Sequence, residues 1–277
     1  MPHREKCVLV ATDFSSRSFE VITKAHAFAT ASKMPLHVVH AIEESFFTRI
    51  PDLEQAKENA LKELQSHFPF ITKEVFHCDK GKVEEVIGAC TNALNTSVVF
   101  LGSGGEKGGL KDLFMGSSTK AIVRALSAPV LVVKTHKEVQ SNKILIPTDF
   151  SESSRWHIHA VRTLFPDASL LLLHVYTVPF GNRLSMYGVK KGEINVLAEN
   201  LKINAQNEGM VFFESLGESK ENAELLVREG GLDTSLFTSI ATMHGIGLIA
   251  LHTTGNISFF AFDLLQETDK DVLITTI

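Results

Sequence analysis

Short apolar runs alternate along the chain with longer amphipathic stretches. In the first half the apolar runs predict five strands, near 7–12, 36–41, 71–78, 97–102 and 129–134. These are continuous Val, Ile and Leu runs without alternation, which is typical of a parallel sheet that is covered on both faces. The stretches between them predict four helices, near 16–32, 53–67, 82–94 and 117–126.

The second half repeats this order. Its apolar runs predict strands near 143–148, 170–176, 223–228, 246–252 and 271–276. Its second helix is longer than its counterpart and is expected near 193–216. Alternating strands and helices predict an α/β fold with two tandem, doubly wound, five-stranded parallel sheets, whose ligands bind outside the carboxyl ends of the strands.

Self-comparison shows that the chain is a duplication. Residues 7–15 read CVLVATDFS and residues 143–151 read KILIPTDFS, so both first strands end in Thr-Asp-Phe-Ser. Residues 80–105 also lie over 230–255 without a gap. A period of about 137 residues is far longer than a solenoid repeat. We therefore expect two domains, 1–136 and 143–277, joined by the polar linker HKEVQSN.

Composition narrows the class of protein. The chain is 44% hydrophobic and 21% charged, which is ordinary globular usage. No apolar run reaches the roughly 18 to 20 residues that span a bilayer. The three cysteines form no metal-ligand pattern and indicate buried thiols in a reducing compartment. These features predict a soluble, cytoplasmic protein.

Charge separates the two halves. The net charge of −5 argues against nucleic acid or a membrane surface as a partner. Residues 1–136 carry 16 Lys and Arg against 15 Asp and Glu, whereas residues 137–277 carry 11 against 17. An anionic ligand would therefore meet a weakly positive first half and a negative second half.

A glycine-rich segment follows the fourth predicted strand. Residues 102–118 read GSGGEKGGLKDLFMGSS and contain six of the chain's 18 glycines. Glycines let backbone N–H groups approach phosphate oxygens, and the helix that starts at the end of the segment adds unpaired donors. The segment matches neither the P-loop nor the dinucleotide fingerprint. By itself it is equally compatible with a phosphate site and with a loop that binds nothing.

The end of the first predicted strand carries a second candidate, Ala11, Thr12 and Asp13. A carboxylate at this place can accept hydrogen bonds from ribose hydroxyls or from an adenine amine. The alternative, at least as well supported by spacing alone, is that Asp13 caps the following helix. Ser15 and Ser16 are also candidate caps for that helix, and Ser117 and Ser118 for the last helix of the domain.

Together these motifs resemble the universal stress protein family. The resemblance rests on TDFS after the first strand, LHVVHA as the second, and the Gly-rich segment with SAPVLVV beyond it. It implies a Rossmann-like sheet that binds ATP, or AMP or ADP, together with Mg²⁺. Ala11, Thr12 and Asp13 would hold the adenosine and Ala41 the adenine through its backbone. The implied phosphate-binding residues are Gly102, Gly105, Gly116, Ser117 and Ser118.

The resemblance also implies how the domains associate. Its members pair their edge strands, so residues 130–133 should lie antiparallel to 272–275 in an intramolecular pseudo-dimer, and a further homodimer is possible. Two departures concern the site. Ala11 replaces the usual proline before Thr-Asp, and ten residues separate Gly105 from Gly116 where nine are usual.

The second domain keeps the first motif and loses the other. Pro147, Thr148, Asp149 and Phe150 preserve the strand end, but only 15 residues separate Gly255 from Asp271, against 23 between Gly105 and Pro129. The missing stretch is the phosphate loop. Asp269 and Asp271 add negative charge in the terminal region, so we expect one nucleotide per chain.

No catalytic constellation accompanies the candidate site. The sequence has no Gly-x-Ser-x-Gly elbow and no evident water-activating residue, and the twelve histidines are expected to be structural and not zinc ligands. We therefore favour a regulatory stress-response protein that binds nucleotide in its first domain. Two alternatives stay open. They are a weak ATPase that uses the same loop, and a nucleotide-independent scaffold with another ligand in the second domain.

Overall fold

The computed structural model describes residues 5–43, 52–103, 117–135, 139, 141–178, 190–219, 221–253 and 259–276. The chain divides into two compact units. Unit 1 comprises the described residues of Met1–Val139 together with Thr253 and Asp269–Thr276. Unit 2 comprises the described residues of Gln140–His252 and Ser258–Thr268. None of the described helices is both long and apolar enough to cross a membrane.

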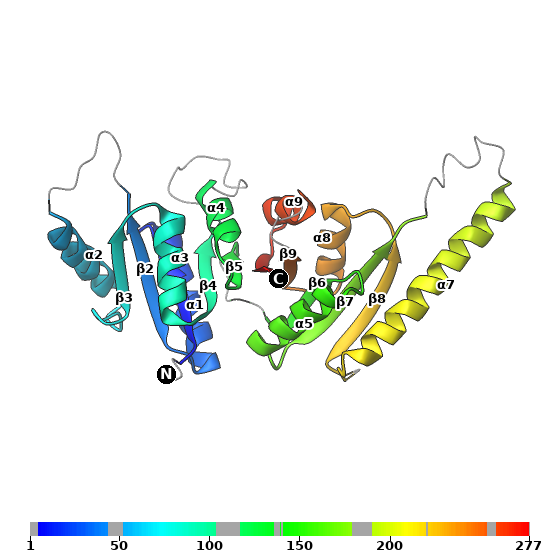
Figure 1. Ribbon diagram of the computed structural model, residues 1–277, viewed down its shortest axis with the longest axis horizontal. Helices are drawn as coiled ribbons and strands as arrows, with labels where there is room; N and C mark the ends of the chain where they lie inside the picture. The colour runs from blue at the N-terminus through cyan, green and yellow to red at the C-terminus, as the bar shows by residue number, and fades with distance from the viewer. Residues whose placement is uncertain are drawn as a thin grey trace. The chain divides into compact units, whose positions relative to one another are not determined.

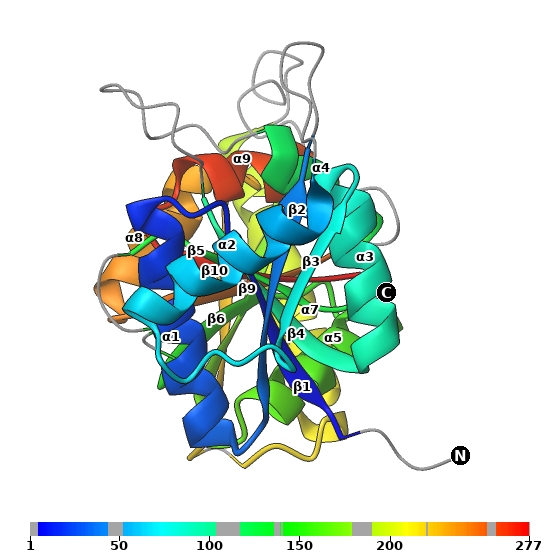
Figure 2. The ribbon, with the colours of Figure 1, turned by 90° about the vertical axis from the view of Figure 1, so that its left-hand side faces the viewer.

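Unit 1 is a doubly wound sheet. Its chain order is β1 (Cys7–Ala11), α1 (Ser16–Ser32), β2 (Leu36–Ile42), α2 (Leu53–His67), β3 (Phe76–Lys80), α3 (Val83–Leu94), β4 (Thr96–Gly102), α4 (Ser117–Ala125) and β5 (Val130–Val133). The strand order is β3-β2-β1-β4-β5, followed by β10 (Asp271–Thr276). Strands β1 to β5 pair in parallel. Helices α1 and α2 cover one face and α3 and α4 the other (Figure 1 and Figure 2).

The helices of this unit agree with the predicted ones, and the β3 strand does not. Residues 71–78 were expected to form the strand, which instead spans Phe76–Lys80. Ile71 is fully buried, but its N–H donates to the Phe68 carbonyl in a turn after α2. Ile71 therefore fills the core from a turn, which its apolar character alone does not distinguish from a place in a strand.

The last strand of the chain, β10, pairs with β5. Residues Val272, Leu273 and Ile274 pair antiparallel with Val132, Leu131 and Val130 of β5. This confirms the predicted pairing of 130–133 with 272–275. The pairing covers the apolar edge of β5, which would otherwise expose unpaired backbone groups.

Asp271 holds the start of β10 against the end of β5. Its fully buried carboxylate accepts hydrogen bonds from the backbone N–H of Lys134 at 2.7 Å and of Thr135 at 2.9 Å. The Thr135 hydroxyl donates to the same carboxylate at 3.2 Å and accepts from the Lys24 ammonium at 3.0 Å. Burial lowers the pKa of Lys134 to about 8, although Asp269 and Asp271 act to raise it. Asp271 is thus an internal counter-charge of unit 1.

Unit 2 has the same kind of winding with strand order β9-β6-β7-β8, all parallel. Its elements are β6 (Lys143–Pro147), α5 (Glu152–Leu164), β7 (Ser169–Tyr176), α7 (Lys191–Ser215), β8 (Ala223–Glu229), α8 (Thr234–Met243), β9 (Leu248–Thr253) and α9 (Phe259–Glu267). The long helix expected near 193–216 is α7, which covers β7 and β8. The Arg155 guanidinium donates to the Ser215 carbonyl at 3.0 Å, so α5 lies beside the end of α7.

A buried histidine lies between α5 and β9. His157 is fully buried, and its ring centroid lies 5.2 Å from that of His252. Burial lowers the pKa of His157 from 6.5 to about 3, although a hydrogen bond with the Ala250 backbone opposes the shift. The equivalent position of α1 is Val21, counted from the aligned serines Ser15 and Ser151, and Val21 is also fully buried.

We expect Asp271→Ala to lower the free energy of unfolding by about 2–4 kcal/mol, because it leaves two buried N–H groups and a hydroxyl without their acceptor. Urea unfolding followed by circular dichroism measures the change. The control is Asp269→Ala, whose exposed side chain pairs with Lys270 and should cost less than about 1 kcal/mol. Equal losses in the two variants would contradict the role given to Asp271.

We expect unit 2 to lose stability as pH falls below 6.5, because unfolded His157 takes up a proton that the native side chain, with a pKa of about 3, does not. One such proton changes the free energy of unfolding by about 1.4 kcal/mol per pH unit. Replacing the histidine by the residue of unit 1, His157→Val, should flatten the pH dependence by that amount. The exposed His159 supplies the control, His159→Gln, in which the slope should stay as in the wild type.

Candidate functional site

The strand order of unit 1 reverses at β1. The chain passes from β1 outward to β2 and β3, then returns to β4 on the other side. Val10 pairs with Val38 of β2 and with Phe100 of β4. The carboxyl ends of β1 and β4 therefore mark the switch point of the sheet, outside which ligands of such sheets bind. Figure 2 looks toward this unit.

A tight turn leads from β1 into α1. The Thr12 hydroxyl accepts from the Phe14 N–H at 3.1 Å and lies 2.9 Å from the Ser18 hydroxyl. The N-cap of α1 is Ser15, whose hydroxyl accepts from the Ser18 N–H at 3.1 Å. This confirms Ser15 as the cap, while Ser16 is the first residue of the helix. The hydroxyl groups of Thr12 and Ser15 therefore form their hydrogen bonds within the turn and the start of α1.

Asp13 supports the cap without being the cap. Its Oδ1 accepts from the Ser15 N–H at 3.1 Å and from the Ser15 hydroxyl at 2.6 Å. The side chain is exposed, and within the described part of the chain both bonds go to Oδ1. The turn therefore orients the carboxylate and leaves Oδ2 available to a ligand.

Phe14 adopts the left-handed backbone region with φ of 63°. For a residue with a Cβ this conformation costs about 1–2 kcal/mol. His40, near the end of β2, stabilises it. The ring of His40 lies edge-on to Phe14 at 4.6 Å, and its Nδ1 donates to the Thr12 carbonyl at 2.8 Å. Strain held by surrounding structure is a feature of functional sites.

Burial of His40 favours its neutral form. Burial lowers its pKa, against the raising effects of its bond to Thr12 and of the Asp13 charge. Because a carbonyl oxygen only accepts, the proton is on Nδ1 and Nε2 carries the lone pair. In this form His40 supports the turn by donating a hydrogen bond to the Thr12 carbonyl, and it carries no positive charge that would attract an anion.

Ala41 and Gly102 end the neighbouring strands. Ala11 pairs with Val39, so Ala41 extends two residues further along β2. Gly102 is two residues beyond Phe100, as Thr12 is two beyond Val10. The Gly102 carbonyl accepts from the Thr119 hydroxyl at 3.3 Å, which ties the first turn of α4 to the end of β4. The register thus gathers Thr12, Asp13 and Gly102 with a helix N-terminus.

Part of the predicted site lies outside the described residues. Gly105 and Gly116 are among them, and the backbones of Ser117 and Ser118 begin α4 while their side chains are not described. The predicted contacts of these four residues with phosphates stay predictions.

Unit 2 repeats the turn. Phe150 is again left-handed with φ of 66°, and its ring stacks on His174 at 4.1 Å. The His174 Nδ1 donates to the Thr148 carbonyl at 2.9 Å. Asp149 accepts from the Ser151 N–H at 3.0 Å and the Ser154 hydroxyl at 2.7 Å. Burial acts to raise the Asp149 pKa, but these hydrogen bonds outweigh it and lower that pKa.

The two units differ at the end of the strand that faces the turn. The gapless alignment of 80–105 with 230–255 places His252 of β9 where unit 1 has Gly102. Burial lowers the pKa of His252, while the Asp149 charge acts to raise it. An imidazole backed by buried His157 therefore occupies the place where a glycine would let backbone approach a ligand.

Other features of the structure lie away from this edge. A cavity of about 500 Å³ opens at the amino-terminal ends of β1 and β2, where Cys7, Pro35 and His37 line it. Over the described ranges, no three His, Cys, Asp or Glu side chains are grouped to hold a metal ion. His37 and His77 form a pair, with Nδ1 and Nε2 2.9 Å apart.

Sequence reasoning missed the role of the strand-end histidine. His40 and His174 lie near the ends of corresponding strands, and the histidines were expected only to be structural. The signal was that both copies kept a histidine together with Thr-Asp-Phe-Ser, residues that meet only across two strands. Contacts between strands far apart in the sequence are set by register, which the sequence does not state.

Comparisons with known proteins agree with this geometry. A model described as Universal stress protein family matches residues 6–134. Universal stress protein A homolog 1 from Coxiella burnetii (strain RSA 493 / Nine Mile phase I) is 34% identical over 140 residues, which cover 46% of this chain and 95% of that protein.

Solved structures match nearly the whole chain. A functionally unknown protein from Pseudomonas aeruginosa PAO1 has a TM-score of 0.66 at 15% identity and covers 98% of this chain and 92% of its own. A universal stress protein from Archaeoglobus fulgidus DSM 4304 has a TM-score of 0.63 at 16% identity, with coverage of 98% and 96%. At such identities the likeness concerns the fold. From the family match and the relative, the chain belongs to the universal stress protein family.

Proposed function

We propose that the protein is a cytoplasmic regulatory protein that binds ATP, or a related adenine nucleotide, in its first domain. The observation that carries the proposal is the juxtaposition of the exposed Asp13 carboxylate with Gly102 at the switch point of the sheet. The turn pre-orients the carboxylate through Ser15, and the glycine offers backbone without a Cβ.

The described residues fit an adenosine. Asp13 Oδ2 would accept from ribose hydroxyls, and the Ala41 backbone at the end of β2 would meet the adenine. Gly102 and the N-terminus of α4 would approach the phosphates, since a helix N-terminus presents N–H donors and positive dipole. Gly105, Gly116, Ser117 and Ser118 complete the proposed phosphate cradle, and Mg²⁺ would neutralise part of the phosphate charge.

The second domain is proposed not to bind nucleotide. His252 stands in the place of Gly102, and the sequence between Gly255 and Asp271 is shorter than its counterpart. Its carboxylate is held much as in the first domain, because Asp149 Oδ1 accepts two hydrogen bonds, from Ser151 and Ser154, as Asp13 Oδ1 accepts two from Ser15. The strand-end aspartate remains, but the groups that would hold phosphates do not.

A regulatory role is favoured over catalysis by the neighbourhood of Asp13. His40 supports the turn through the hydrogen bond from its Nδ1 to the Thr12 carbonyl, and the sequence carries no evident water-activating residue. Purified protein with ATP and Mg²⁺ should therefore bind stoichiometrically and release little phosphate. Steady multiple turnover in a phosphate-release assay would establish the ATPase alternative instead.

The aspartates of the two domains provide a matched pair for titration calorimetry with ATP and Mg²⁺. Wild-type protein should bind one nucleotide per chain. Asp13→Ala removes one or two charge-assisted hydrogen bonds of about 1.5–3 kcal/mol each and should weaken binding roughly tenfold to more than a hundredfold. Asp149→Ala should leave the affinity nearly unchanged. Two equivalent sites, or equal damage from both substitutions, would contradict the proposed asymmetry.

Gly116→Val tests the role of the glycine-rich segment in phosphate binding, which is inferred from the sequence alone. The added side chain should block the backbone approach to phosphate and abolish binding, with the circular dichroism spectrum unchanged. The comparison variant is Gly192→Ala on α7, where a Cβ has no neighbour within 4 Å. Wild-type affinity in folded Gly116→Val would exclude Gly116 from the site.

A further inference from the structure

Two histidines of unit 1 meet across neighbouring strands, away from the turn after β1. His37 Nδ1 of β2 and His77 Nε2 of β3 are 2.9 Å apart, and the ring centroids are separated by 5.1 Å. His77 pairs with Val39 in the parallel register, and His37 precedes Val39 by two residues. Residues two apart in a strand point to the same face, so both imidazoles project from one face of the sheet.

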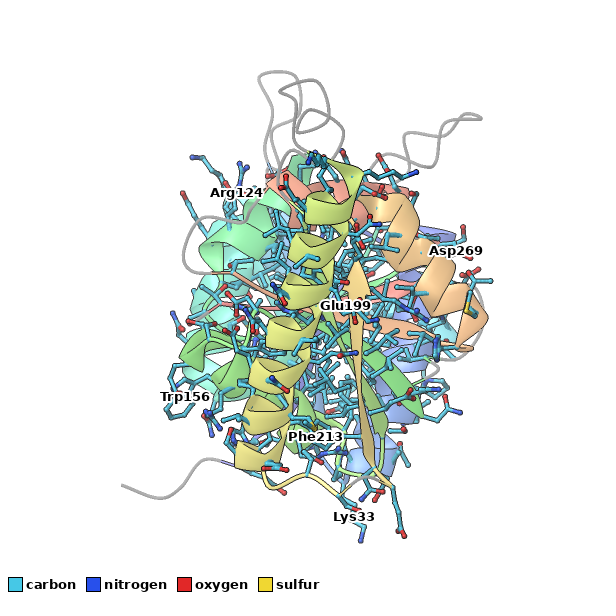
Figure 3. All side chains as sticks on the ribbon, turned by 90° about the vertical axis from the view of Figure 1, so that its right-hand side faces the viewer. Lys33, Arg124, Trp156, Glu199, Phe213 and Asp269 are labelled. Atoms are coloured by element: carbon cyan, nitrogen blue, oxygen red, sulfur yellow. The ribbon has the colours of Figure 1, made fainter. Side chains whose placement is uncertain are left out.

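The pair borders the cavity of about 500 Å³ at the amino-terminal edge of the sheet. His37 lines this cavity together with Glu5, Cys7 and the last two residues of α3, Ala93 and Leu94. Helix α1 ends at the same edge with its C-cap Lys33, which is labelled at the lower end of Figure 3. The carboxyl ends of the strands, where we propose nucleotide binding, lie at the opposite edge. A ligand at the histidine pair would therefore occupy a separate site.

The surroundings of the pair favour a cation. The C-terminal end of a helix carries partial negative charge, and α3 presents that end to the cavity. The Glu5 carboxylate adds a full negative charge at its rim. Burial lowers the pKa of both His37 and His77, although the Asp79 charge acts to raise that of His77. Both rings are thus held in the neutral form, which is the form that binds metal ions.

The separation of the two nitrogens is close to that in a zinc site. Zinc–nitrogen bonds of about 2.0–2.1 Å at a tetrahedral angle place two imidazole nitrogens about 3.3–3.4 Å apart. The observed pair would have to open by about 0.4–0.5 Å, and the broad χ2 torsion of histidine permits such a rotation. The proton shared in the hydrogen bond would move to the other nitrogen of its own ring, so both facing nitrogens would offer lone pairs.

The nearby thiols are poor candidates for ligands. Cys7 lines the cavity, but its Sγ donates to the Leu94 carbonyl at 3.4 Å, and burial raises its pKa. Cys78 follows His77 and points to the opposite face of β3, and burial raises its pKa to about 11. Metals bind the thiolate and not the thiol. Among the described residues no third His, Cys, Asp or Glu side chain joins the group, so water would take the remaining positions on an ion.

We propose that His37 and His77 form a binding site for a divalent transition-metal ion of which Zn²⁺ is the type, with the two imidazole nitrogens as protein ligands and water completing the coordination. Imidazole nitrogen suits zinc and its neighbours among the transition metals, whereas Mg²⁺ and Ca²⁺ prefer oxygen. The site gives a ligand-binding role to one pair of the twelve histidines, which were expected to be structural. It does not depend on the proposed nucleotide site.

The test is calorimetric titration of the untagged full-length protein with Zn²⁺, after removal of bound metal with a chelator. The wild type should bind one ion more tightly than any further ions. His37→Ala and His77→Ala should each weaken that binding at least about tenfold, since even loss of a group that only supports a ligand costs about 10–100-fold. Two controls should bind as the wild type does, and these are His159→Gln, at an exposed histidine of α5, and Asp13→Ala. A wild type that binds no Zn²⁺, or tight binding that survives in both alanine variants, would overturn the proposal.

Nitrogen NMR identifies the ligands in the wild type, without any substitution. On addition of Zn²⁺ the side-chain resonances of His37 Nδ1 and His77 Nε2 should shift, and those of His159 should stay in place. Calorimetry in two buffers of different ionisation enthalpy should show almost no proton release, because both rings are already neutral, whereas a thiol ligand would release about one proton per ion. Release of a proton with unshifted His37 and His77 resonances would place the ion on a cysteine and refute the histidine site.

Discussion

Parallel pairing of β1 with both β2 and β4 is the constraint on which the rest of unit 1 depends. Parallel strands need crossover helices, so both faces of the sheet are covered and every strand delivers its carboxyl end to one edge. The reversal of direction at β1 separates the crossover helices and leaves room at that edge. Thr12, Asp13 and Gly102 come together for this reason, although 88 residues lie between Asp13 and Gly102 in the sequence.

The turn after β1 is a rigid unit that both domains retain. A left-handed phenylalanine, a strand-end histidine that donates to a carbonyl, and an aspartate that supports a serine cap recur with small changes in geometry. Retention of this unit in both halves indicates that it serves the fold as well as any ligand. The domains differ at the end of the strand that faces the turn. The first has Gly102 at this position, and the second has the half-buried His252. Both domains thus keep the residues that support the turn, and they differ at the strand end where we propose that the first domain binds a ligand.

The last strand of the chain is part of unit 1, together with the first half of the sequence. Strand β10 pairs with β5, and Asp271 accepts hydrogen bonds from two backbone groups just beyond β5. From the sequence, Asp271 was expected to contribute negative charge in the terminal region of the second domain. In the structure its charge is buried against Lys24, Lys134 and Thr135 of unit 1. A carboxylate that serves as an internal acceptor affects the stability of the first unit more than the ligands of the second.

The pairing of 130–133 with 272–275 followed from the resemblance to the family. By itself the sequence determined the order and type of nearly all elements and the duplication. These depend on local periodicity, on capping residues such as Ser15 and on similarity between halves, all of which can be read along the chain. Only the tertiary structure decided that Ile71 fills the core from a turn, that His40 and His174 support the strained phenylalanines, and that Asp271 is buried in unit 1. Each of these depends on contacts between residues distant in sequence, and strand register and burial arise only when the sheet is assembled.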